Sequence, residues 1–204
     1  MTASSFDPVE IPWDCAAQVM DCFRIGVILA GVGGRVLAAN RPAHEICSLK
    51  DGLEFSREFL RTALPQETSE LRNLIVAGRA PVFLALSRPS GKRPLSVLIR
   101  SLSQDRDASS SERPMAVVFV SDPDQRLDVD PAGVKDLYGL TPAEAAVASL
   151  VGVGRPVLEA ARRLGVQTNT VRMQLKQVYA KTGARRQSAL VYLIMTGPAH
   201  LRLG

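Results

Sequence analysis

A cationic helix face near the carboxyl end of the sequence carries residue types suited to hydrogen bonding with another polar molecule. At about 100° per residue, one face of segment 168–181 carries Asn169, Arg172, Met173, Lys176 and Ala180. Residues 168–186 contain five Lys or Arg and no Asp or Glu. A helix exposed only for solubility normally interleaves Glu and Lys. Because Arg and Lys donate hydrogen bonds to base edges in the DNA major groove and to the flanking phosphates, the pattern predicts contact with double-stranded DNA.

Two helices joined by a tight turn would position this face. Their apolar residues recur at helical spacing: Leu158, Ala161 and Leu164 in the first helix, and Val171, Leu175 and Val178 in the second. Gly165 follows the first helix, where a residue that tolerates positive φ is favoured. A helix pair joined by a short turn with glycine is the helix-turn-helix arrangement. The apolar pattern alone also fits an ordinary helix pair, and the cationic face favours the helix-turn-helix.

The flanking residues extend this pattern to a known family. Thr141, Pro142 and Glu144 have the spacing of a capping box with proline in the first turn. From Leu140 to about Met195 the sequence resembles the LuxR/GerE-type helix-turn-helix domain of bacterial transcription regulators. The matching residues are LTPAE (140–144), Gly154, EAAxxLGV (159–166), NTVR (169–172), LKxVYxKTG (175–183) and RQ (186–187). The resemblance implies four helices, at about 141–152, 156–164, 168–181 and 185–196.

The resemblance also implies roles for individual side chains. Arg172, Met173 and Lys176 stand where family members reach base edges, and Met173 suits a thymine methyl group. The whole implied DNA-contacting set is Thr168, Asn169, Thr170, Arg172, Met173, Lys176, Arg185 and Arg186. Its two threonines would meet phosphates, and its last two arginines would lie near the DNA backbone. Gln167 departs from the usual Ser or Thr cap, so we expect the cap to shift to Thr168. The alternative for each cation is a solvated side chain.

The last predicted helix is apolar over more than half its circumference. The residues that would cover the domain's own core are Ala189, Leu190, Leu193 and Ile194. Val191, Tyr192 and Met195 remain, and an exposed apolar patch usually has a partner. The resemblance implies dimerisation through this helix. The alternative is that these side chains lie under the tail, residues 197–204.

Charge divides the chain into two parts. Residues 1–125 hold 14 Lys and Arg against 15 Asp and Glu, whereas residues 126–204 hold 11 against 5. Localised basic charge is typical of a nucleic-acid-binding module joined to another domain. We expect an N-terminal helix in 1–24, an input domain in 25–122, a linker in 123–139 and the helix-turn-helix domain in 140–204. A short helix carrying Val134, Leu137 and Tyr138 would dock the linker against either domain.

Several partners and compartments are disfavoured. The sequence has no signal peptide and no apolar run of the ~18 residues that a membrane span needs, so we expect a cytoplasmic protein without a membrane partner. Three cysteines, Cys15, Cys22 and Cys47, fit a reducing compartment. Their spacing matches no zinc pattern, and we expect them to be buried as small apolar residues. No metal site is predicted.

The first 125 residues predict an antiparallel sheet with helices, so the chain as a whole falls in the α+β class. We expect a helix at 13–23, a β-hairpin over 25–40, and helical segments at 41–48, around 55–63 and at 66–78. Strands at 81–88, 94–103 and 115–122 follow, with a solvated loop at 104–113. Asn40 is expected to cap the helix from Arg41.

This order resembles a PAS domain, supported by GRVLAAN (34–40), RPSG (88–91) and a closing strand that ends in Asp122-Pro123. The resemblance implies a dimerisation and signal-relay module. Neither His44 nor His200 stands where it would place a haem ligand, so no cofactor is predicted. A small apolar ligand is possible, and its identity is unknown.

These features favour a homodimeric, sequence-specific transcription regulator. An enzyme is disfavoured because the sequence lacks a nucleophile–base pair and both G-x-S-x-G and C-x-x-C. The alternative is a helix-turn-helix that docks a protein without touching DNA.

Overall fold

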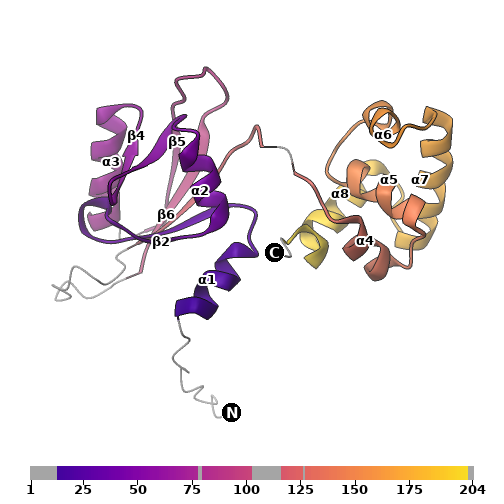
Figure 1. The fold of residues 1–204 in the computed structure, drawn as a ribbon, viewed down its shortest axis with the longest axis horizontal. Coiled ribbons are helices and arrows are strands. Elements are labelled where there is room, and N and C mark those ends of the chain that lie inside the picture. Colours follow the sequence, from indigo (N-terminus) through magenta and orange to yellow (C-terminus); the bar gives the residue numbers. More distant parts are fainter. Residues whose placement is uncertain (1–12, 78–79, 103–115, 126, 202–204) are drawn as a thin grey trace, which may run out of the picture. The chain divides into compact units, whose positions relative to one another are not determined.

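The computed structural model describes residues 13–77, 80–102, 116–125 and 127–201, without the side chains of residues 13, 14 and 77. The chain forms two compact units, divided between Gln125 and residue 126. The first combines a sheet with helices and the second is helical (Figure 1). The predicted α+β class is therefore confirmed.

An antiparallel five-stranded sheet is the centre of the first unit. Its strands are β1 (Gly26–Ala30), β2 (Val36–Ala39), β5 (Val82–Leu86), β6 (Leu95–Ser101) and β7 (Ala116–Ser121). They lie in the order β2-β1-β7-β6-β5. A 3₁₀ turn, η1 (Val32–Gly34), joins the β1–β2 hairpin, which confirms the hairpin predicted for residues 25–40.

Helices α2 (Arg41–Ser48) and α3 (Pro65–Ala77) cover one face of this sheet, and α1 (Trp13–Asp21) precedes it. The side chains buried in this core include Ile28, Leu71, Ile75, Leu95, Val97, Val118 and Val120. Gly26 permits the close approach of α2 to β1, since a Cβ there would lie 2.9 Å from Cα of Ala43.

Asn40 caps α2 as predicted, and it also connects α1 and β1 to that helix. Its side-chain oxygen accepts hydrogen bonds from the backbone N–H groups of Ala43 (3.1 Å) and Val27 (2.8 Å). Its amide group donates to the carbonyl oxygens of Met20 (2.8 Å) and Ile25 (3.0 Å). A buried amide with all its groups paired fixes the path of the chain between the three elements.

The segment around residues 55–63 is a hairpin, so its predicted helical character was wrong. Strands β3 (Leu53–Ser56) and β4 (Phe59–Thr62) pair antiparallel. Along β4 the side chains alternate between exposed and buried, with Leu60 and Thr62 inside. Arg57 takes a left-handed φ of 56° in the turn between the strands. Period-two burial and a left-handed turn residue are incompatible with a helix.

A buried arginine ties the β5–β6 connection to the end of β7. Arg88 donates from Nε to Asp51 (2.8 Å) and from Nη1 to Asp122 (2.7 Å). Burial alone would lower the pKa of Arg88, but its hydrogen bonds to Asp122 and Asp51 raise that pKa above its usual value. Hydrogen bonds from Ser90, followed by Arg88, lower the pKa of Asp51 to about 2. The network therefore stays charged at neutral pH.

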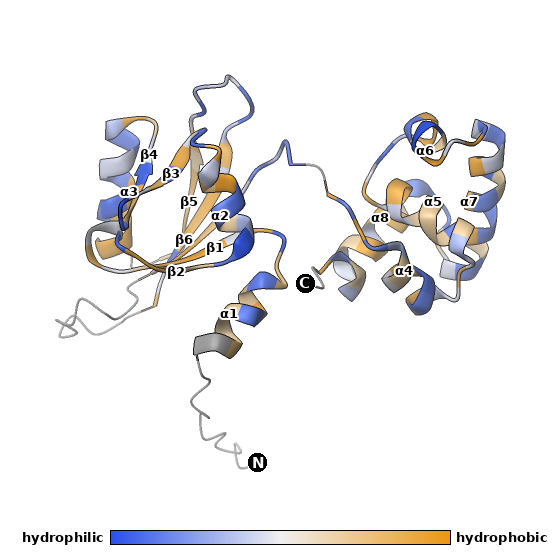
Figure 2. Ribbon diagram, viewed as in Figure 1, coloured by the Kyte–Doolittle hydropathy of each residue, from blue (hydrophilic) through white to orange (hydrophobic). Residues whose placement is uncertain are grey.

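The second unit consists of five α-helices and a 3₁₀ turn within the residues that the structure describes. They are α4 (Pro131–Tyr138), α5 (Pro142–Gly152), α6 (Val157–Leu164), α7 (Thr168–Thr182), α8 (Gln187–Thr196) and η2 (Pro198–His200). Fully buried side chains from α4, α5, α7 and α8 meet in one core: Val134, Val151, Val171, Val178, Leu190 and Ile194. Figure 2 shows α5 mainly hydrophobic and α7 mainly hydrophilic. The linker helix α4 docks on this unit through Val134.

The cysteines follow the prediction only in part. Cys47 is buried, and burial raises the pKa of its thiol to about 12. Cys15 is exposed and Cys22 is half-buried, so the expectation that all three are buried was wrong. Cys15 lies on α1, outside the sheet's core. Among the described residues, no group of His, Cys, Asp and Glu could hold a metal ion, and no helix is long and apolar enough to span a membrane.

Candidate nucleic-acid interface

The turn between α6 and α7 has the geometry that the sequence predicts. Gly165 adopts φ 66° and ψ 28°, a left-handed conformation that ends α6. The N–H group of Val166 then donates to the carbonyl oxygen of Ala161 (3.1 Å). Ala160 and Ala161 are both buried, and their small side chains let α7 approach closely. The two helices therefore form a helix-turn-helix.

The N-cap of helix α7 lies one residue before the one that we expected. Gln167 is its N-cap, with no hydrogen bond from its side chain, and Thr168 is already helical. The expected shift of the cap to Thr168 was therefore wrong, because Gln167 has the extended backbone of a cap although its side chain forms no capping hydrogen bond. The first N–H groups of α7 thus receive no side-chain cap from Gln167, which suits an anion at this end of the helix.

The buried side of α7 is the predicted one, with Val171, Leu175 and Val178 in the core. The opposite side presents Asn169, Thr170, Arg172, Met173 and Lys176 as exposed residues, and Thr168 is half-buried. Met173 is 66% exposed, so its apolar side chain is accessible beside Arg172 and Lys176. Helix α7 therefore brings the predicted base-reading residues onto one accessible face.

The cations on and near this face are not paired with carboxylates of the residues that the structure describes. Within the described part of the chain, Arg172, Lys176, Arg185 and Arg186 form no ion pair. Lys181 differs from them, since its Nζ lies 2.6 Å from Oε2 of buried Glu144. Four cations near α7 therefore remain available to an external anion, and Lys181 serves the fold.

Glu144 connects the predicted capping box to α7. Its carboxylate accepts from the N–H group of Thr141 (2.7 Å), and its own N–H donates to the Thr141 hydroxyl (3.3 Å). The hydrogen bond from Lys181 and then that from Thr141 hold the pKa of Glu144 below its usual value. The capping box is confirmed, and it also anchors the C-terminal part of α7 to the start of α5.

Arg155 is a structural residue that the sequence analysis missed. Its guanidinium lies 2.8 Å from both Asp128 in the linker and Glu159 in α6. Its backbone carbonyl accepts from Nε2 of Gln187 (3.2 Å) at the start of α8. Burial alone would lower the pKa of Arg155, but hydrogen bonds to Glu159 and Asp128 raise it. Arg155 thus holds the segment before α4 and the start of α8 against α6.

Helix α8 begins at Gln187, two residues later than predicted. Arg185 and Arg186 therefore lie before the helix, and both are exposed. Tyr192 is 71% exposed, whereas Val191 and Met195 are half-buried. Leu158 on α6 was predicted to face the core but is 52% exposed, since Ala160 and Ala161 take the buried side.

Comparisons with known proteins give structural similarity alone. No family model matches the chain, and neither does any curated protein. Among solved structures, the chain is similar to phage VqmA in complex with DPO, at 16% identity over 90% of this chain and 88% of that chain, with a TM-score of 0.38. It is also similar to a Vibrio cholera VqmA–ligand–DNA complex, at 16% identity over 96% and 92%, with a TM-score of 0.36.

A third similar structure is a Vibrio cholerae VqmA dimer without target DNA, described among LuxR-type receptors. The identity is 17% over 91% of this chain and 87% of that chain, with a TM-score of 0.35. At such TM-scores the similarity carries no conclusion about function.

Proposed function

We propose that the chain is a cytoplasmic bacterial transcription regulator that binds double-stranded DNA through α7. The observation that carries the proposal is the exposed, carboxylate-free face of α7, with Arg172, Met173 and Lys176 opposite a fully buried apolar stripe. Arg and Lys there suit the acceptor edges of guanine, and Met173 suits a thymine methyl group.

The phosphates flanking this groove would meet a second set of residues. Thr168 and Thr170 lie in the first turn of α7, beside N–H groups that an anion can bind. Arg185 and Arg186 precede α8 and form no ion pair within the described residues. Phosphate contacts fix the position of a protein on DNA, and base contacts provide its specificity.

Binding as a homodimer follows because a two-fold operator needs two DNA-contacting helices and each chain has one α7. A two-fold operator presents two half-sites about one DNA turn apart, and each chain supplies one α7. The exposed Tyr192, with Val191 and Met195 beside it, offers a contact between two copies of the helical unit. The first unit would serve as the input domain, without a bound cofactor and with no enzymatic activity.

A helix-turn-helix that docks a protein is the competing function, and salt dependence separates the two. We expect the full chain to bind duplex DNA with an affinity that falls steeply as salt rises, because each neutralised phosphate releases counterions. Titration of a labelled duplex at several salt concentrations measures this slope. Absence of DNA binding at low salt would favour the docking module. If the chain does bind DNA, genomic footprinting would identify the operator.

A further inference from the structure

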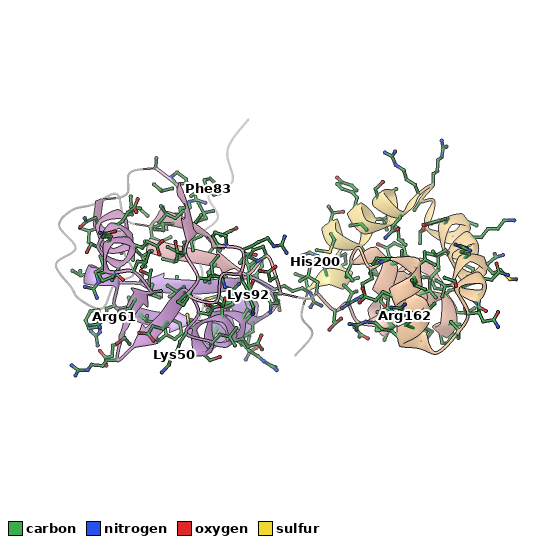
Figure 3. The ribbon with its side chains drawn as sticks, turned by 90° about the horizontal axis from the view of Figure 1, so that it is seen from above. Lys50, Arg61, Phe83, Lys92, Arg162 and His200 are labelled. Atoms are coloured by element: carbon green, nitrogen blue, oxygen red, sulfur yellow. The ribbon has the colours of Figure 1, made fainter. Side chains whose placement is uncertain are left out.

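The exposed face of α7 is divided lengthwise into a charged part and an uncharged part. Arg172 and Lys176 are four residues apart and form a cationic row along the helix. Met173 and Gln177 have the same spacing, are both exposed, and form an uncharged row. The uncharged row lies about 100° round the helix from the cationic row. Figure 3 shows side chains of α7 extending away from the body of the second unit.

The uncharged row ends at Gln177, because the next residue in line serves the fold. Lys181 follows Gln177 by four residues, but its Nζ lies 2.6 Å from Oε2 of Glu144. Ala180, exposed in the same turn, has a short side chain that leaves the amide accessible. Within the part of the chain that the structure describes, the side-chain amide of Gln177 has no hydrogen-bond partner. Gln177 therefore presents a free donor and a free acceptor beside the exposed Met173.

The two rows suit different base pairs in the major groove. Guanine presents two acceptors there, which suit the donors of Arg172 and Lys176. Adenine presents one acceptor and one donor, and a carboxamide pairs with both at once. Thymine, the partner of adenine, carries a methyl group that suits an apolar side chain such as Met173. The uncharged row thus matches both bases of A·T pairs, as the cationic row matches guanine.

The spacing of the uncharged row also fits neighbouring base pairs. Four residues of an α-helix rise by about 6 Å, and successive base pairs are about 3.4 Å apart. Met173 and Gln177 therefore reach base pairs that are at most about two steps apart. A short A·T-containing segment next to guanine is the sequence that suits the whole exposed face.

We propose that Gln177 is a specificity-determining residue that recognises adenine, so that each half-site contains an A·T pair beside the guanine contacted by the cationic row. Its Nε2 group donates to adenine N7, and its Oε1 atom accepts from the N6 amino group of the same base. This inference rests on the proposed function, since it concerns the same helix. It adds a residue outside the predicted DNA-contacting set and names the base that this residue recognises.

Selection of duplexes from a randomised pool by the full chain, followed by sequencing, tests the contact. We expect the parent to select an adenine that Gln177→Ala no longer selects, while the guanine preference is unchanged. Gln177→Glu should change that preference from adenine to cytosine, because a carboxylate accepts from the cytosine N4 amino group. Gln66→Ala, at an exposed amide on α3, is the matched control and should select the sites of the parent. Identical sites for the parent and Gln177→Ala would overturn the proposal.

A base analogue tests the atoms involved. Replacing the selected adenine by 7-deazaadenine removes the N7 acceptor and should lower the affinity of the parent at least about fivefold. The same replacement should leave the affinity of Gln177→Ala unchanged, as measured by fluorescence anisotropy. Unchanged thermal unfolding of the variant shows that its fold is kept. An equal loss in the parent and in Gln177→Ala would mean that another group contacts adenine N7, which would also overturn the proposal.

The two proposals fail in different ways. If the parent binds no duplex even at low salt, the proposed function fails, and the role of Gln177 fails with it. If the parent binds and selects DNA but Gln177→Ala has the same preferences, only the adenine contact is refuted. DNA binding through α7 is then still tested independently by the replacement of Arg172 and Lys176.

Discussion

The exposed side chains of α7 divide into two kinds at the residue scale. Arg172 and Lys176 donate hydrogen bonds and carry charge, whereas Met173 offers only apolar contact. Specificity at a base pair arises from directional bonds, and general affinity arises from charge. Replacing Arg172 or Lys176 should therefore lower both the sequence preference and the affinity for DNA. Replacing the arginines before α8 should lower the affinity alone.

Replacing Arg172 by Ala should lower operator affinity by ~1–3 kcal/mol and relax the preference at one base pair. Lys176→Ala should weaken binding in the same range. Fluorescence anisotropy with the footprinted operator and with single-base variants measures both effects. Lys135→Ala, at an exposed cation on α4, is the control and should bind as the parent does. Parent-like binding by both α7 variants would show that α7 does not read the DNA.

The Glu144–Lys181 contact gives the second unit an acid-sensitive stability. Because the folded pKa of Glu144 is lowered, its stabilisation is present above the ordinary glutamate pKa of ~4.3 and is lost as pH falls through the folded value. Urea unfolding between pH 3 and 7, followed by NMR signals of α5, should show stability falling on the acid side. Glu144→Gln should flatten that fall, and Asp136→Asn, at an exposed carboxylate, should leave it unchanged. An equal acid slope in parent and Glu144→Gln would contradict the assignment.

At the scale of elements, the sequence was sufficient to predict those features that depend on hydrogen bonds between neighbouring residues. The capping box at Thr141 and Glu144, the left-handed Gly165 and the Asn40 cap depend on residues close in sequence, and all three were predicted. The β3–β4 hairpin was missed because it has only four residues per strand, too few for periodicity to separate a strand from a helix.

Long-range contacts explain the remaining errors. Leu158 has helical spacing with Ala161 and Leu164, yet only packing shows that Ala160 and Ala161 face the core. The role of Arg155 depends on Asp128, 27 residues before it, and no local pattern joins the two. Likewise, the sequence predicted the linker helix α4 but not the unit on which it docks. The burial of Val134 in the helical core shows that this is the second unit.

The segment before α4 is part of the folded helical unit, which leads to a prediction about its boundary. Val129 is buried in the helical core, and a buried valine contributes ~1.5–3 kcal/mol. A fragment covering 126–204 should therefore be more stable than one covering 132–204 by at least that amount, as measured by urea unfolding, since the shorter one also lacks Asp128, a partner of Arg155. Val129→Ala in the longer fragment should reproduce part of the loss. Val166→Ala, at a 41% exposed position, should not. Equal stability of the two fragments would refute this boundary.

At the scale of the whole molecule, charge and apolar surface are distributed separately. The excess of cations lies after residue 125, and an apolar face of the sheet, opposite α2 and α3 and including the exposed Phe83, lies before it. The continuous apolar runs of β1 and β7 already indicate burial on both faces, but only the strand registers show which residues share this face. We therefore assign dimer assembly to the first unit and DNA contact to the second.

Separating the two units should separate these activities. Residues 126–204 carry 11 Lys and Arg against 5 Asp and Glu, whereas residues 1–125 carry 14 against 15. Since neutralisation of phosphates supplies most non-specific affinity, the fragment 126–204 should bind duplex DNA in a salt-sensitive manner. Its binding should be weaker than that of the full chain, because it lacks the dimer contact of the first unit. The fragment 1–125 should not bind DNA at any salt concentration but should still form dimers. Electrophoretic mobility shifts over a salt series measure both fragments, and DNA binding by 1–125 equal to that of 126–204 would refute the division.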